Sequence, residues 1–324
     1  MTAGPDPIGE LRRRSAALAA LPIPGQGRTA ERFHSLWELG SVDLTLGRLG
    51  EAHADGHAIL GEADRPDLAA LDGSPSVFGV WASDPPDGQV TLDREGAGWR
   101  LHGTKRWCSG ACLVDRALVT ARLDHEVMLA CVDLGLDGVT PHPAGEWITP
   151  ALAGADTRSV DLDLHLDQHA LVGPAGWYLS RPGFWWGAVG VAAVWAGGAA
   201  GLIARLLGGW RGDPISLSHL GAAHASVETA LAIIDSTAAA IDSDPSMPSD
   251  GAARLAYVTR HVADLTASAV IEHTTRALGP GPMTQDWAVS KRLADLALFV
   301  RQSHAERDLA TLGRLVARHA EPSG

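Results

Sequence analysis

The octet Gly103-Thr104-Lys105-Arg106-Trp107-Cys108-Ser109-Gly110 is the stretch on which the interpretation of the fold depends. It follows two short strand-like runs and precedes a third, at residues 116–122. A tryptophan two residues before a serine, at the end of a strand, can place its indole against a planar aromatic cofactor while the hydroxyl hydrogen-bonds a heteroatom at the cofactor's edge. The alternative is that Trp107 is a core aromatic of a small β-domain, and only the surrounding chain can separate the two interpretations.

The composition bounds the class of protein. The chain has 324 residues, a formal net charge of −12 and a pI of about 5.5. Its length predicts two or three packed units, and its acidity disfavours nucleic acid and anionic membranes as partners. The three cysteines form no CxxC pair, which indicates a reducing compartment. The first ten residues show no charged segment followed by an apolar one, so we expect no signal peptide and a cytoplasmic location.

Upstream of the octet, residues 7–70 carry apolar side chains at the helical period, with Ser41 and Asp43 as expected capping residues. Within this segment, Glu51-Ala52-His53-Ala54-Asp55-Gly56-His57 could be taken for a metal-binding cluster. On a helix, however, the acidic pair and the histidine pair point to different faces and cannot meet one ion. We therefore expect helix-packing histidines here and no metal site.

Residues 75–173 contain short runs rich in β-forming residues, broken at close intervals by Gly, Pro and Asp. The segment 93–98 is typical of a hairpin connection. This spacing predicts a small antiparallel barrel or sandwich. The expected strands cover residues 77–82, 89–93, 99–103, 116–122, 127–134, 159–164 and 170–172.

From residue 174 the chain is helical again, with long helices expected at 182–204, 216–242, 251–278 and 286–319. The first of these contains no charged residue, and its Gly197 and Gly201 have the small-xxx-small spacing of membrane helices. A central bundle helix packed on all sides has the same features, because Gly and Ala permit close backbone approach. Since the rest of the chain has a balanced composition, we expect a buried bundle helix.

This order of segments, together with the octet, resembles the acyl-CoA dehydrogenase superfamily of flavoproteins. The resemblance covers most of the chain. It predicts an α+β protein with a short N-terminal helical segment (1–73), a central antiparallel β-barrel or sandwich domain (74–173) and a C-terminal four-helix bundle (174–324). The octet is similar to the family's G-x-K-x-W-I/C-S/T-N/G motif. Further similar segments are residues 51–53, 83–85, 115–122, 196–201 and 212–215.

The resemblance implies that the chain binds FAD, with Trp107 beside the flavin ring system, Ser109 near flavin N5 and Ser83 near the pyrimidine edge. Cys108 belongs to the same implied cofactor-binding motif. In the family, a glutamate removes the substrate α-proton as hydride passes from the β-carbon to the flavin. The implied activity is therefore α,β-dehydrogenation of an acyl thioester.

The chain departs from the family pattern at its phosphate-binding positions. The N-terminal segment is short, and residues 86–88 lead from the turn at 83–85 straight into a strand, where the family has a run with a phosphate-binding serine. Glycines stand at 208–209, where the family has an arginine that meets the FAD diphosphate. Arg276 could supply that positive charge instead.

The family's catalytic glutamate has no counterpart at its usual place. The last-helix signature puts Ser303 at that position, and the alternative position on the first bundle helix falls near Val191. His304 or Glu306 could act as the base instead, since a histidine titrates near neutral pH. The alternative is that residues 302–308 are a solvated polar stretch of an amphipathic helix.

Three functions remain open at this point. The first is an FAD-dependent dehydrogenase of an acyl thioester, and the second is a degenerate subunit that supports a related partner's flavin site. The third is a flavin monooxygenase or oxidase, which needs no α-proton base. We expect an enzyme that acts on a small molecule and assembles through its bundle helices, as a homodimer, a homotetramer or a pair with a related subunit. No run of residues identifies the substrate.

Overall fold

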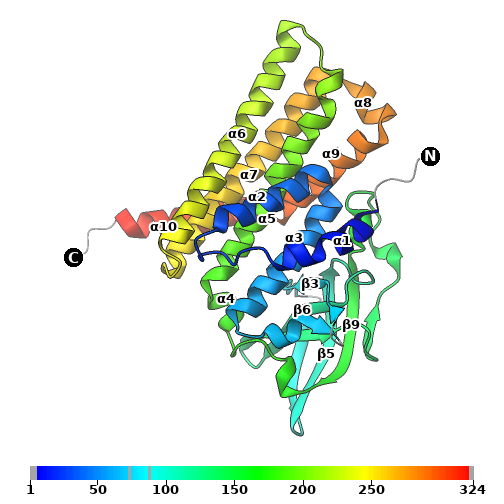
Figure 1. The fold of residues 1–324 in the computed structure, drawn as a ribbon, viewed down its shortest axis with the longest axis vertical. Helices are drawn as coiled ribbons and strands as arrows, with labels where there is room; N and C mark the ends of the chain where they lie inside the picture. The colour runs from blue at the N-terminus through cyan, green and yellow to red at the C-terminus, as the bar shows by residue number, and fades with distance from the viewer. Residues whose placement is uncertain (1–5, 72–73, 87–88, 321–324) are drawn as a thin grey trace. The chain divides into compact units, whose positions relative to one another are not determined.

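The computed structural model describes residues 6–71, 74–86 and 89–320 (Figure 1). Backbone contacts divide the chain into two compact units. The sheet unit comprises Met1–Ile23, Arg48–Thr149 and Ala153–Phe184, and the helical unit comprises Pro24–Gly47, Pro150–Leu152 and Trp185–Gly324. The expected N-terminal segment is thus shared between the units, and the three-part division of the chain stays a prediction. Residues 87–88, at the altered phosphate-binding turn, lie outside the described residues.

Three helices occupy the segment that was expected to be helical: α1 (Pro7–Ala19), α2 (Thr29–Val42) and α3 (Leu44–Glu62), followed by the 3-10 helix η1 (Pro66–Ala69). The capping prediction for Asp43 is confirmed, since its carboxylate accepts a hydrogen bond from the Leu46 backbone N–H at 2.9 Å. The prediction for Ser41 is wrong. This residue lies inside α2, where its hydroxyl donates to the Glu38 carbonyl one turn earlier.

A seven-stranded sheet forms the body of the sheet unit. Its strands are β3 (Phe78–Trp81), β4 (Val90–Glu95), β5 (Gly98–Cys108), β6 (Arg116–Leu123), β7 (Glu126–Asp133), β8 (Val139–Pro141) and β9 (Arg158–Leu166). They follow the order β3-β6-β4-β5-β9-β8, and β7 pairs with β6. A separate two-stranded ladder joins β1 (Ala70–Leu71) to β2 (Ser74–Pro75). The hairpin expected at 93–98 is confirmed by the pairing of Glu95 with Gly98.

The sheet is mixed, so the prediction of a wholly antiparallel domain is wrong, and a closed barrel is not confirmed. Strand β6 runs parallel to β3, from the pair Phe78–Arg116 onward, and parallel to β4 at a single pair. Alternation of apolar residues shows that a segment is a strand but not the direction of its neighbour. The strand expected at 170–172 is reduced to a single antiparallel β-bridge between Leu171 and Ala130, because Gln168–Ala170 form the 3-10 helix η4. Strand β8 has no counterpart among the expected strands.

The core of the sheet unit is built from alternate strand positions, as the period of a strand requires. In β9 the apolar residues at 160, 162, 164 and 166 are buried, and the polar residues between them are exposed. In β5 the side chains of Trp99, Leu101 and Lys105 are buried by the same alternation. This alternation along β5 sets the position of the octet's side chains.

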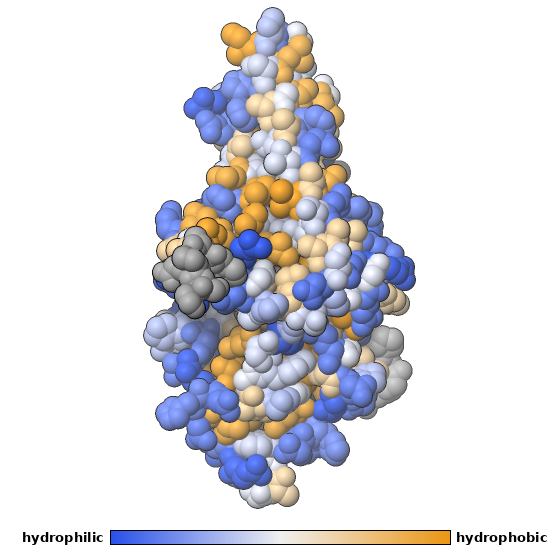
Figure 2. Space-filling model, turned by 90° about the vertical axis from the view of Figure 1, so that its left-hand side faces the viewer, coloured by the Kyte–Doolittle hydropathy of each residue, from blue (hydrophilic) through white to orange (hydrophobic). Residues whose placement is uncertain are grey.

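The helical unit is built around α5 (Pro182–Leu206), α6 (Pro214–Ser243), α7 (Ser249–Leu278) and α9 (Trp287–Phe299), with α2 packed against α6 (Figure 1). Shorter helices are α8 (Pro280–Gln285) and α10 (Glu306–Ala320) in this unit, and α4 (Trp177–Ser180) in the sheet unit. Helices α6 and α7 are antiparallel, and a buried hydrogen bond of 2.8 Å joins the hydroxyls of Thr237 and Thr259. Apolar areas are exposed on these helices (Figure 2).

The helix expected at 286–319 is wrong as a single element, because the structure divides it into α9 and α10. A 3-10 turn at Val300–Gln302 ends α9, Ser303 is extended, and Ala305 has a left-handed φ of 43°. Local hydrogen bonds stabilise the break: the Ala305 N–H donates to the Ser303 hydroxyl, and the His304 N–H donates to the Asp308 carboxylate. Short polar side chains that bond to nearby backbone compete with a continuous helix in this way.

Helix α5 packs against α2 through glycines, as expected of a bundle helix. A Cβ at Gly197 would lie 2.0 Å from the Trp37 carbonyl oxygen, and one at Gly201 would lie 2.2 Å from the Ser41 carbonyl oxygen. The small-xxx-small spacing therefore permits close contact between helix backbones. By length and composition alone, the segment Pro182–Gly209 could cross a membrane, but 72% of its most apolar window is buried inside the protein. This burial supports the prediction of a bundle helix.

Candidate functional site

Trp107 lies at a β-bulge. The register of β5 against β9 shifts between the pair Lys105–Val160 and the pair Cys108–Arg158, so two residues of β5 oppose one residue of β9. Without the bulge, the alternation that turns Lys105 inward would turn Trp107 inward as well. Instead, 55% of Trp107 is exposed. The alternative interpretation of Trp107 as a core aromatic is therefore wrong.

The backbone of Trp107 is strained. Its φ is 58°, in the left-handed region that bulky residues rarely adopt. Such a conformation costs on the order of 1–3 kcal/mol, persists only where the surrounding structure imposes it, and is found most often at functional sites. The guanidinium carbon of Arg106 is 5.8 Å from the indole centroid, within the range of a cation–π contact. The bulge thus presents an aromatic face that a second planar ring could cover.

Ser109 lies just beyond the bulge and is almost fully buried. Its hydroxyl is 2.9 Å from the Thr157 hydroxyl, and either group can be the donor. Its carbonyl oxygen accepts a hydrogen bond of 3.0 Å from the Trp81 indole N–H. The next residue, Gly110, has a φ of 78° and donates its N–H to the Ala155 carbonyl at 2.7 Å. Both sides of the Ser109 backbone are therefore held in place.

Lys105 and Cys108 point into the core of the sheet unit. The Lys105 ammonium donates to both the carbonyl and the hydroxyl of Thr120, each at 2.8 Å. Burial lowers the pKa of Lys105 to about 8, although the nearby Asp84 carboxylate opposes this shift. The Cys108 thiol is fully buried and donates to the Lys105 carbonyl, and burial raises its pKa. Cys108 therefore lies in the interior and not beside the exposed indole.

The Ser83 turn is connected to the octet through strand β3. Ser83 lies two residues beyond the end of this strand and is half-buried. Its neighbour Asp84 forms an ion pair of 2.5 Å with Arg122 of β6. Trp81, the last residue of β3, donates to the Ser109 carbonyl. The structure thus links the segment that carries Ser83 to the segment that carries Trp107 and Ser109.

The predicted catalytic residues lie in the helical unit, at the start of α10. The His304 side chain is 67% exposed, and its Nδ1 is 3.4 Å from the Asp308 carboxylate, whose side chain is only 15% exposed. Glu306 is exposed in the first turn of α10 and Ser303 is half-buried in the break before it. Arg276, predicted to meet a diphosphate, forms an ion pair of 2.8 Å with Glu272 on α7. The structure therefore supplies an exposed histidine close to a carboxylate, and a cation that already has a partner.

The two histidines of the segment 51–57 are packing residues. The Phe78 N–H donates to Nδ1 of His53, so the proton of this imidazole is on Nε2, which donates to the Ser15 carbonyl at 3.0 Å. Burial lowers the pKa of His53. His57 packs edge-on against Phe78. Across residues 6–71, 74–86 and 89–320, no group of three or more potential ligands could hold a metal ion.

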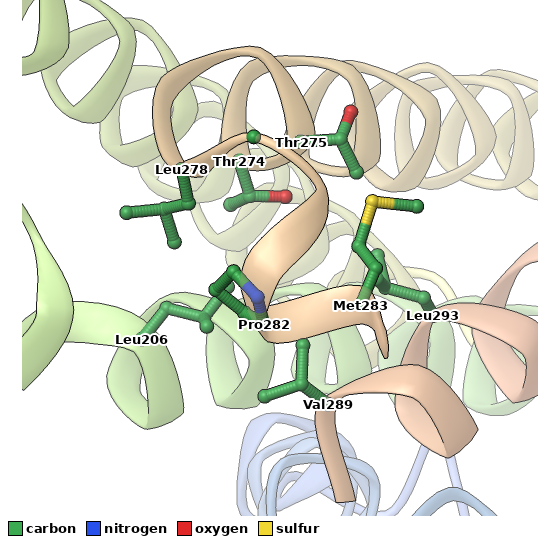
Figure 3. Close-up of a pocket in the computed structure, with 9 residues that line it drawn as sticks. Leu206, Thr274, Thr275, Leu278, Pro282, Met283, Val289 and Leu293 are labelled. Carbon is green, nitrogen blue, oxygen red and sulfur yellow. The ribbon is translucent and has the colours of Figure 1, made fainter. Parts of the chain in front are cut away.

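A small apolar pocket lies within the helical unit, where α7, α8 and α9 meet the end of α5 (Figure 3). Its volume is about 10 Å³, which leaves room for about one water molecule. The side chains around it include Leu206, Thr274, Met283 and Val289 (Figure 3). This pocket is too small for a flavin or for any substrate larger than water.

Several residues around the site were not found from the sequence. Thr120, Thr157 and Trp81 come from three distant segments, and no local pattern connects them with the octet. Two signals were present, however. Lys105 occupies an inward position of an alternating strand, where a lysine is unusual. The spacing of His304 and Asp308, four residues apart, would place both on one face of a continuous helix, and the two stay close in the structure although the helix begins only at Glu306.

Comparison with solved structures gives extensive matches at low sequence identity. FMN-bound TdsC from Paenibacillus sp. A11-2, a dibenzothiophene monooxygenase, has a TM-score of 0.81 and 19% identity over 97% of this chain and 90% of that chain. KijD3 in complex with FMN and a dTDP-linked amino-keto sugar has a TM-score of 0.80 and 17% identity over 97% and 86%. The nitroalkane oxidase of Podospora anserina has a TM-score of 0.77 and 19% identity over 98% and 88%. No protein-family model and no curated protein matches the sequence.

Proposed function

Because the chain has the fold of the acyl-CoA dehydrogenase superfamily, as the sequence resemblance predicted, we propose that it is a flavin-dependent oxidoreductase of the monooxygenase or oxidase type. The observation that carries this proposal is the strained, exposed Trp107 at the bulge of β5. A protein gains nothing in stability by holding a large aromatic residue at positive φ in solvent, so we infer that the indole serves a ligand.

The residues around the bulge fit a flavin. The Trp107 indole offers an open π-face for an isoalloxazine ring, and the Ser109 hydroxyl can donate to a ring heteroatom while it accepts from Thr157. A bound flavin would supply the electron transfer that these side chains cannot perform. The part of the protein would be to bind and orient the ring and to restrict the access of water to it.

The choice of oxygen chemistry over dehydrogenation rests on the missing base. Dehydrogenation of a thioester needs a group that removes an α-proton, and the two positions where the family holds a glutamate carry Ser303 and Val191. A serine hydroxyl is far too weak a base for that step at neutral pH. TdsC is a monooxygenase and the Podospora anserina protein is a nitroalkane oxidase, which supports the monooxygenase or oxidase alternative. The experiments below must distinguish the monooxygenase or oxidase from two alternatives. These are a dehydrogenase of an acyl thioester and a degenerate subunit.

The proposal covers FMN as well as FAD. The sequence predicted FAD, with Arg276 as a cation for its diphosphate. In the structure this guanidinium is paired with Glu272, and FMN has no diphosphate to bind. TdsC and KijD3 are both described with FMN. The identity of the flavin is therefore a question for titration.

His304 is the predicted catalytic residue with the better-defined environment. Its Nδ1 lies 3.4 Å from the Asp308 carboxylate, and the same carboxylate accepts a hydrogen bond of 3.2 Å from the His304 backbone N–H. Glu306 is exposed in the first turn of α10. We therefore propose His304, ahead of Glu306, as the substitute base in the alternative function, the dehydrogenation of an acyl thioester.

The first test is a titration of the purified protein with FMN and, separately, with FAD, followed by visible absorbance. We expect stoichiometric binding of one of them, and at least about tenfold weaker binding by Trp107→Ala, which corresponds to about 1.4 kcal/mol. Trp287→Ala is the matched control, since this tryptophan is 70% exposed but lies in the helical unit. Tight binding that survives Trp107→Ala would contradict the placement of the ring.

The second test separates the three functions. Oxygen uptake that depends on reduced flavin supports the proposed monooxygenase or oxidase. Anaerobic bleaching of the bound flavin by butyryl-CoA would instead identify a dehydrogenase. A protein that binds neither FMN nor FAD would identify a degenerate subunit, and the proposed function would fail.

A further inference from the structure

A chain of buried polar contacts lies beneath the bulge. The Lys105 ammonium donates to the carbonyl and to the hydroxyl of Thr120. The Thr120 hydroxyl in turn donates to the Trp81 carbonyl at 3.4 Å. The indole N–H of Trp81 donates to the Ser109 carbonyl at 3.0 Å. All four residues are at most 7% exposed. We call Lys105, Thr120 and Trp81 the clamp, because they join the chain just before the bulge to the chain just after it.

The clamp is assembled by tertiary contacts from three strands. Lys105 belongs to β5, Thr120 to β6 and Trp81 to β3. Gly79 leaves room for the hydrogen bond from the Trp81 indole to the Ser109 carbonyl, because a Cβ at position 79 would lie 2.8 Å from the indole nitrogen. The strained residue, Trp107, thus lies between two anchored points, Lys105 and Ser109. This arrangement is what a positive φ needs in order to persist in a bulky residue.

Stability alone does not account for Lys105. Its hydrogen-bond acceptors are both neutral, and the surrounding charges act in opposite directions, with Asp84 stabilising the ammonium and Arg122 destabilising it. Replacing a buried charge by an apolar side chain of similar volume is often neutral or stabilising, so a retained buried charge can serve to specify one conformation. At this position, the conformation to be specified is that of residues 106–109.

We propose that Lys105, Thr120 and Trp81 are positioning residues that hold the bulge at 106–109 in the conformation that presents Trp107 and Ser109 to a ligand. The identity of the ligand as a flavin rests on the proposed function, whereas the conformation of the bulge does not. The proposal can therefore be tested both without and with flavin.

Without flavin, the readout is backbone amide exchange of the peptide 105–112, measured by mass spectrometry. Trp81→Phe keeps most of the packing and removes the N–H that Ser109 accepts. We expect exchange in this peptide to become about tenfold faster, the factor that corresponds to 1.4 kcal/mol. Trp99→Phe is the matched control, because Trp99 is also buried in the sheet unit and donates its indole N–H at 2.9 Å, but to Gln168. Lys105→Met provides a second variant if Trp81→Phe does not fold.

With flavin, the readout is the fluorescence of the bound cofactor, which an indole quenches when the two rings stack. We expect strong quenching in the wild type and in Trp99→Phe, and partial recovery of fluorescence in Trp81→Phe and in Lys105→Met. A loss of global stability alone would not change the fluorescence of the folded, flavin-bound protein.

Faster exchange at 105–112 in Trp81→Phe but not in Trp99→Phe, together with the fluorescence change, supports the clamp. Equal behaviour of the two tryptophan variants overturns it. If the wild type binds no flavin, the proposed function fails, while the exchange comparison still decides whether the clamp holds the bulge.

Discussion

At the scale of single residues, Trp107 combines exposure with strain. A tryptophan that contributes to a core costs about 3–5 kcal/mol when it is truncated, whereas a residue at positive φ in solvent contributes little and stores strain. Natural proteins commonly accept a destabilised conformation at a site where function needs it. The position of Trp107 is therefore best understood through what it contacts when a ligand is present.

This view predicts opposite responses of stability and binding at Trp107. Glycine adopts positive φ without steric cost, so Trp107→Gly should leave the free energy of unfolding within about 1 kcal/mol of the wild type. The same variant should lose flavin binding. Denaturant unfolding and flavin titration measure the two effects. Trp99→Ala, at a buried position of the same strand, should in contrast lose about 3–5 kcal/mol. A comparable loss in Trp107→Gly would show that the indole is structural.

Lys105 predicts a pH dependence of stability. Its pKa falls from 10.5 to about 8 in the folded protein, so between these pH values the unfolded chain binds a proton that the folded chain does not. The free energy of unfolding should therefore rise with pH in this window, by up to about 3 kcal/mol. The measurement is the difference in unfolding free energy between the wild type and Lys105→Met at pH 7.5 and at pH 9.5, which cancels other titrating groups. A difference that does not change with pH would mean that the ammonium is not desolvated.

At the scale of secondary-structure elements, the crossing of α2 and α5 depends on glycines from both helices. Gly197 and Gly201 of α5 face the carbonyls of Trp37 and Ser41, and a Cβ at Gly40 of α2 would lie 2.2 Å from the Val194 carbonyl. Backbone faces backbone here, so no side chain can move to make room. The small-residue run that resembled the family's first bundle helix thus has a packing function in this chain.

Gly197→Ala should accordingly separate α2 from α5. Its new methyl group would lie 2.0 Å from the Trp37 carbonyl oxygen, and we expect a loss of about 1–3 kcal/mol in the free energy of unfolding. Gly221→Ala on α6 is the control, since nothing lies within 4 Å of the added Cβ. That substitution should stabilise the protein by about 0.5–1 kcal/mol through helix propensity. Equal melting temperatures of the two variants would argue against close packing at the crossing.

At the scale of the whole molecule, the helical unit carries several large apolar side chains that are exposed to water. Ile215 and Trp287 are 73% and 70% exposed, and Leu207 and Leu217 are each about half exposed. Figure 2 shows apolar areas, in orange, on one face of the molecule. The sequence predicted assembly through the bundle, and this surface supports that proposal.

We therefore expect the purified protein to self-associate. Light scattering coupled to gel filtration should give a mass of at least twice 33.8 kDa, and Ile215→Asp should shift the equilibrium toward the monomer, because it places a charge in an apolar contact. Leu136→Asp, at a residue 46% exposed in the sheet unit, should leave the mass unchanged. A wild-type protein that is monomeric at all concentrations would contradict the proposed self-association.

The sequence by itself determined the order of helical and strand-rich segments, the alternation along β9, the bundle character of α5 and the resemblance to a flavoprotein fold. These features depend on local periods and on motifs that one segment contains. Only the tertiary structure decided the parallel pairing of β6, the break before α10 and the outward turn of Trp107. The alternation of side chains along β5 would place the Trp107 indole inside. The bulge that turns it outward arises from pairing with β9 and from the clamp, which joins residues far apart in the chain. A one-residue shift in strand register moves a side chain to the opposite face, and register is set by the neighbouring strands and not by the segment itself.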